Sequence, residues 1–136
     1  MGAATSASGF NSRAAQRARL LTFIAIVSSL AALSAMLNPD GVATQLGMLL
    51  VGVNGYSQFY AIYVGVRLAT AGLALLAARH GDQPILGDVT ALIILAQPLG
   101  RFIAAFAIGL PQGTLLVICG LELLGGIVLL LLRPRS

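Results

Sequence analysis

The sequence is poor in charge, and arginine supplies all of its basic side chains. Charged residues make up 9% of the 136 residues, against roughly 25% in an ordinary soluble domain. Hydrophobic residues make up 58%, and the mean hydropathy is +0.95. A nucleic-acid-binding protein would gather its arginines on a polar surface, whereas these arginines lie beside or inside apolar runs. The composition therefore predicts an integral membrane protein and argues against a nucleic-acid partner.

Tryptophan is absent, and there is one cysteine and one histidine. Without tryptophan, anchoring at the membrane interface is left to tyrosine. The single Cys119 excludes an intramolecular disulfide and any CxxC redox or zinc motif. His80 has no second histidine or cysteine near it in the sequence, so we expect no metal ion and no cofactor. No pairing of a nucleophile with a base is visible, so we expect no enzyme activity.

The N-terminal residues 1–12 are rich in alanine, serine and glycine and contain no acid, which predicts a disordered tail before a single domain at 13–136. The first apolar run, Leu20–Leu37, is long enough to span a bilayer. Two alternatives stay open, a signal peptide cleaved near Ala32-Leu33-Ser34 and an organelle transit peptide. The length of the run favours a helix that is retained.

Turn signals follow the first run. Asn38 can cap a short helix with Pro39 in its first turn and Gly47 beyond its end. Asn54-Gly55 predicts a second turn.

Three further apolar runs complete the chain. Asp88 and Thr114 are expected to cap the last two, and Pro98 is expected to interrupt the third span. Short connections make the third and fourth spans antiparallel neighbours. The predicted fold is all-α, an integral membrane bundle of four transmembrane helices at about 20–37, 58–78, 89–110 and 114–132.

The arginines also predict the orientation. The loop Asn38–Ser57 and the turn Pro111–Gly113 contain no arginine, whereas both chain ends and the loop after the second span do. By the positive-inside rule, both termini are cytoplasmic, and we expect a multi-pass protein of the bacterial inner membrane. The arginines expected to contact lipid headgroups are Arg13, Arg17, Arg19, Arg79, Arg133 and Arg135.

Three charges lie inside the apolar runs: Arg67, Arg101 and Glu122. Counted at 1.5 Å per residue from the outer span boundaries, all three lie about 12 to 14 Å deep, near the middle of a ~30 Å core. Ser28 and Ser29 fall in the same layer. A charge at this depth costs several kcal/mol unless it is paired, so the three side chains are expected to lie together.

We expect Glu122 to accept a bidentate pair from Arg101, its hairpin neighbour, with Arg67 completing the cluster. Buried ion clusters often only fix helix register. The alternative follows from the net charge of +1, which a second anion would balance. Candidate side chains around such an anion are Ser28, Ser29, Tyr63, Thr70 and Gln97.

Two stretches, YAIYVGVRLATAGLALLAAR and PLGRFIAAFAIGLPQGTLLVICGLELLGGIVLLLLR, resemble small bacterial four-helix membrane proteins of domain-of-unknown-function family 4345. The resemblance covers about Leu20 to Arg133, and its most specific marks are Arg67, Gly100-Arg101 and Glu122. It implies the four-helix fold and the charged layer and supplies no activity. The family is loosely similar to DoxX-like membrane proteins, which are linked to quinone-coupled redox complexes.

The small size, short loops and glycine/alanine strips predict a non-catalytic accessory or scaffolding subunit, embedded in the lipid bilayer and packed against a larger membrane complex or further copies of itself. A binder or carrier of a small anion or amphiphile at the charged layer is the first alternative. A quinone-linked redox subunit is the second.

Overall fold

The computed structural model describes residues 2–135, and all of its regular structure is helical. The helices are α1 (Gly2–Leu37), α2 (Pro39–Gln45), α3 (Gly52–Tyr60), the π-helix η1 (Ala61–Val66), α4 (Arg67–Arg79), α5 (Pro84–Ile108) and α6 (Thr114–Leu131). Four segments are long and apolar enough to cross a membrane, namely Ser12–Leu37, Gly52–Arg79, Pro84–Ile108 and Thr114–Leu131. The predicted all-α class with four candidate spans is confirmed at this level.

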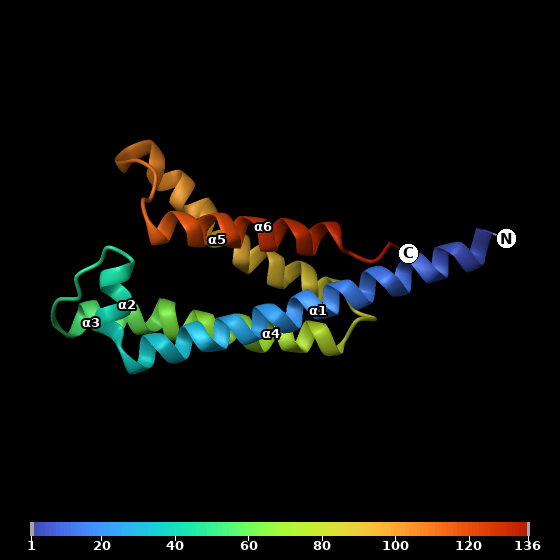
Figure 1. Ribbon diagram of the computed structural model, residues 1–136, viewed down its shortest axis with the longest axis horizontal. Coiled ribbons are helices and arrows are strands. Elements are labelled where there is room, and N and C mark those ends of the chain that lie inside the picture. The colour runs from blue at the N-terminus through green and yellow to red at the C-terminus, as the bar shows by residue number, and fades with distance from the viewer. Residues whose placement is uncertain (1, 136) are drawn as a thin grey trace.

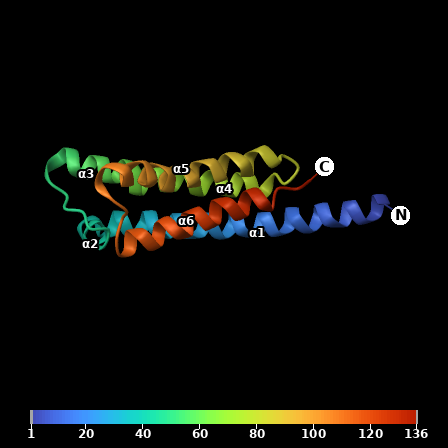
Figure 2. The ribbon, with the colours of Figure 1, turned by 90° about the horizontal axis from the view of Figure 1, so that it is seen from above.

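Each span packs on the next along the chain. α1 runs along α4, α4 packs on α5 and α5 runs along α6, whereas α1 and α6 meet at few places. In Figure 2, α4 and α5 form one layer and α1 and α6 the other. Both chain ends lie at one end of the bundle, called the terminal end here, and α2 lies at the opposite, loop end (Figure 1). The α5–α6 pair approaches the α1–α4 pair at the terminal end and diverges from it toward the loop end.

The main core lies in the terminal half, where all four spans meet. Its buried members are mostly alanines, whose small side chains let helix backbones approach closely. They are Leu21, Ala25, Ala74, Ala77, Ala91 and Leu129. A second cluster at the loop end joins Ala35 of α1, Ala43 of α2 and Phe59 of α3, and it contains no residue of α5 or α6. The packing therefore holds the two helix pairs together at one end of the bundle.

The short helix α2 forms as its sequence predicts. The Asn38 side chain accepts a hydrogen bond from the backbone N–H of Gly41 at 3.1 Å, and Pro39 is the first helical residue. Gly47 follows the helix with φ +77°, which favours glycine. The Tyr56 hydroxyl donates to Asp40 Oδ1 at 2.6 Å and ties α3 to α2.

Two helix starts differ from prediction. Asn54-Gly55 is not a turn but lies inside α3, because the chain turns earlier at Gly52, whose φ is +66°. Asp88 does not cap α5, which begins at Pro84. Proline has no backbone N–H to lose and a φ suited to the first helical turn, so it starts the helix there.

Three further expectations are corrected. Gly113 rather than Thr114 is the residue before α6. α5 continues through Pro98 without interruption. α1 begins at Gly2, so residues 2–12, expected to be disordered, are helical in the structure. Their high alanine content and lack of proline are compatible with a continuation of the first span.

Candidate functional site

Glu122 of α6 pairs with arginines from two other helices. Arg101 Nη1 of α5 donates to Glu122 Oε2 at 2.7 Å, and Arg67 Nη2 of α4 donates to Oε1 at 3.1 Å. The expected bidentate pair with Arg101 is wrong, because each arginine takes one oxygen. The structure thus brings together the three charges of the predicted layer, called the central cluster below.

Each arginine of the central cluster follows a helical turn whose backbone hydrogen bonds depart from the regular α-helical pattern. The π-helix η1 ends at Val66, directly before Arg67. Pro98 lies three residues before Arg101 and leaves the carbonyl one turn earlier without its usual helical donor. Single π-helical turns inside longer helices are frequent at functional sites. The π-helix was not predicted from the sequence, since Ala61–Val66 contains no proline to mark a disturbed helical turn.

The central cluster is largely buried and carries a net charge of +1. The side chains of Arg67, Arg101 and Glu122 are 18%, 16% and 10% exposed. Arg67 makes one hydrogen bond to the described residues, and Arg101 makes a second, longer one to Gln97 Oε1 at 3.4 Å. The two guanidinium groups offer ten N–H donors between them, so most of these donors lack an acceptor in the part of the chain that the structure describes.

The five predicted lining residues have different environments. Gln97 contacts the cluster through Arg101. Thr70 of α4 is buried but donates to the Val66 carbonyl, at the end of η1, at 2.8 Å. Tyr63 stacks on the Phe59 ring, with centroids 4.8 Å apart. Ser28 is buried in α1, and Ser29 is exposed.

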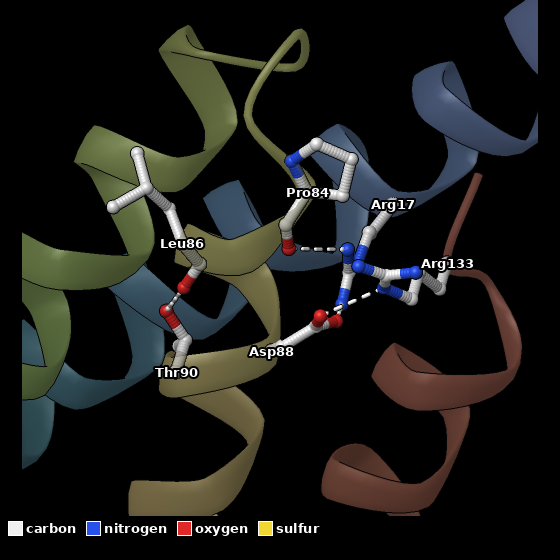
Figure 3. Close-up of polar contacts among 6 residues, drawn as sticks. All are labelled: Arg17, Pro84, Leu86, Asp88, Thr90 and Arg133. Carbon is white, nitrogen blue, oxygen red and sulfur yellow. Dashed lines mark hydrogen bonds and ion pairs between the residues drawn. The ribbon is translucent and has the colours of Figure 1, made fainter. Parts of the chain in front are cut away.

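A second arginine–carboxylate–arginine cluster lies at the terminal end. Arg17 Nη2 of α1 donates to Asp88 Oδ1 at 2.6 Å, and Arg133 Nε, beyond the end of α6, donates to Asp88 Oδ2 at 2.7 Å. Arg17 Nη1 also donates to the Pro84 carbonyl at 3.0 Å. Figure 3 shows Asp88 between the two arginines, with Arg17 lying against the start of α5. This terminal cluster joins α1, α5 and the C-terminal segment.

Glycine makes room for the terminal cluster. A Cβ placed on Gly87 would lie 2.6 Å from Arg17 Cζ and 2.8 Å from its Nε. The guanidinium therefore rests against the bare backbone of α5, and Arg17 is 4% exposed. The terminal cluster was not predicted from the sequence, because Asp88 was expected to cap a helix. A signal was present, since Asp88 and Asp82 are the two acids beside the six arginines at this end.

Of the six arginines expected to contact lipid headgroups, two form an ion pair with Asp88 and the other four differ in exposure. Arg17 is buried and pairs with Asp88. Arg133 pairs with Asp88 but keeps a side chain 53% exposed. Arg13 is half-buried, and Arg19, Arg79 and Arg135 are exposed.

Close packing between α5 and α6 lies between the two clusters along these helices. A Cβ on Gly126 of α6 would collide with the Leu95 side chain of α5, so the glycine sets the separation of the two helices.

Cys119, one turn from Glu122, is buried. Within residues 2–135, no group of three His, Cys, Asp or Glu side chains is placed to hold a metal ion.

Comparison with known protein families gives one result. The pattern of the family described as "Domain of unknown function (DUF4345)" matches residues 18–133. The chain belongs to this family. The matched region contains the central cluster and most of the terminal cluster but begins one residue after Arg17. Comparison with curated proteins and with solved structures gives no match.

Proposed function

We propose that this protein is a non-catalytic membrane protein that binds an anionic group at the central cluster. One observation carries the proposal: two guanidinium groups share one carboxylate, and most of their N–H donors have no acceptor among the described residues. In a hydrocarbon environment, an unpaired donor costs several kcal/mol. A negatively charged acceptor would accept hydrogen bonds from these donors. It would also balance the excess charge of +1 on the central cluster.

The chemistry of the donors selects the ligand class. Guanidinium groups bind carboxylate and phosphate oxygens best, because the planar fork matches their geometry. Because α1 and α6 meet at few places, we propose that such a group enters between them from the bilayer. A ligand that reaches this depth through lipid needs an apolar part as well, so we propose an amphiphile with a carboxylate or phosphate headgroup.

Calorimetric titration tests this proposal. The purified protein in dodecyl maltoside micelles is titrated with dodecyl phosphate. Arg101→Gln should weaken binding by about tenfold, because it removes one charge-assisted donor. Glu122→Gln should tighten binding, since the competing carboxylate is gone. Arg79→Gln removes an exposed arginine at the terminal end and should leave the affinity unchanged. Equal affinities for the wild type and Arg101→Gln would remove the central cluster from consideration.

A second candidate is an accessory subunit whose partner supplies the missing anion as a transmembrane carboxylate. At the loop end of α5, Phe106 is 95% exposed and Ile108 is 85% exposed, which offers an apolar surface to lipid or to a partner. Such a surface can pack against a partner's helix. Purification from native membranes in mild detergent is the test, and a monodisperse protein without a stoichiometric partner would contradict this candidate.

The proposed location is the cytoplasmic membrane of a bacterium, with both termini in the cytoplasm. The support is the arginine count, since six arginines lie at the terminal end and none in the segments at the loop end. A fluorescent reporter fused to Ser136 should be active, and a phosphatase reporter there should be inactive. The opposite result would reverse the orientation.

A further inference from the structure

The terminal cluster contains an unsatisfied buried donor. Arg17 Nε is buried and has no hydrogen-bond partner among the residues whose side chains are described. Its two Nη groups are already bound, one to Asp88 and one to the Pro84 carbonyl. A buried guanidinium N–H without an acceptor is costly, so a native structure that keeps one requires an explanation.

A small hollow of about 10 Å³ lies beside this guanidinium. That volume accommodates one oxygen-sized atom. Arg17 lines the hollow, and the rest of its wall comes from α1, the end of α4, the following loop, the start of α5 and the C-terminal segment. The other lining residues include Ala77, His80, Gly81, Gln83, Gly87 and Pro134. No carboxylate is among them.

Charge selects what enters the hollow. Asp88 neutralises only one of its two arginines, which leaves the terminal cluster at +1. Arg133 uses Nε on Asp88, and with a side chain 53% exposed its Nη groups can reach a group outside the bundle. The loop beside the hollow carries Asp82 as well as His80 and Arg79, so it adds no net negative charge.

We propose that the terminal cluster is a binding site for a phosphate group. One phosphate oxygen enters the hollow and accepts a hydrogen bond from Arg17 Nε after a small rotation of the guanidinium. The remaining oxygens stay outside and accept from Arg133. The phosphate belongs either to a phospholipid headgroup or to free phosphate, and the two sources share this chemistry. The site is separate from the central cluster and does not depend on the function proposed for it.

The first test follows the Arg17 Nε–H directly. Protein labelled with ¹⁵N at arginine Nε is prepared in dodecyl maltoside, which contains no phosphate, and Arg17→Lys identifies the Arg17 resonance. Phosphatidylglycerol is added to one sample and inorganic phosphate to another. A downfield shift with slowed hydrogen exchange in either sample supports the site. A shift with phosphatidylglycerol alone identifies the lipid as the source, and a shift with inorganic phosphate identifies the free ion. No shift in either sample overturns the proposal.

The second test uses a matched pair of variants. Gly87→Ala places a methyl group 2.8 Å from Arg17 Nε and displaces the guanidinium. Gly100→Ala adds the same methyl group on the same helix, where nothing lies within 4 Å. In native mass spectrometry of detergent-solubilised protein, Gly87→Ala should bind phosphatidylglycerol about tenfold more weakly than the wild type and Gly100→Ala should not. Equal binding by all three proteins contradicts the site. If Gly87→Ala does not fold, the shift of the Arg17 Nε–H resonance in the wild-type protein is the deciding measurement.

Discussion

The two arginine–carboxylate–arginine clusters share one design but differ in their surroundings. In each, a carboxylate gives one oxygen to each of two arginines from different segments of the chain. The terminal cluster lies at the end of the bundle where the two helix pairs come together, and one of its arginines is half-exposed. The central cluster lies beyond the main core, and all three of its side chains are mostly buried.

Because their surroundings differ, the ion pairs contribute differently to stability in the two clusters. At the terminal end, van der Waals packing already joins α1, α4, α5 and α6, and the ion pairs add to it. In the central cluster, two buried cations depend on one carboxylate, so the balance of charge dominates. Burying ions costs several kcal/mol, which good pairing only just repays. We therefore expect the central cluster to respond more strongly to loss of its acid.

Removal of the acids tests the comparison most strongly. Glu122→Gln should lower the free energy of unfolding by about 3–5 kcal/mol, because it leaves two buried guanidinium groups without a counter-ion. Asp88→Asn should cost less, since the Arg133 side chain is 53% exposed and water can hydrate it. Reversible unfolding in mixed detergent micelles, followed by circular dichroism, measures both. An equal or larger loss for Asp88→Asn would show that the comparison is wrong.

Packing between the clusters is the next test. Gly126→Ala should destabilise the protein by about 1–3 kcal/mol, because the added methyl group collides with Leu95 and pushes α5 from α6. Gly125→Ala is the matched control, since nothing lies within 4 Å of its added Cβ. The same unfolding assay applies. Combination with Leu95→Ala should restore part of the lost stability, and a failure to do so would assign the loss to another contact.

The smallest effect is expected at the half-exposed arginine. Arg133→Gln should cost less than about 1 kcal/mol, because an ion pair in contact with solvent is weak. High salt should reduce the difference between this variant and the wild type, since ions screen exposed charges. Unfolding at low and high salt measures it. A loss as large as that of Glu122→Gln, or one insensitive to salt, would mean that Arg133 is structurally equivalent to the buried arginines.

Sequence reasoning could predict the helices and the central layer because both depend on regular spacing. A constant rise per residue places Arg67, Arg101 and Glu122 at similar depths whatever the packing. The same reasoning failed at Asp88, where a local role as helix cap competed with a partner 71 residues away. A local pattern carries no information about which distant side chain can reach that carboxylate.

By itself, the sequence determined that the protein is helical and has four runs able to cross a membrane, because composition and run length are local properties. It also contained the excess of arginine over acid in both clusters. Only the tertiary structure decided how the charges pair. The contact of Arg17 with α5 requires the space that Gly87 leaves open, and the division of the Glu122 oxygens follows from its place between α4 and α5. These are relations between distant segments, and packing fixes them.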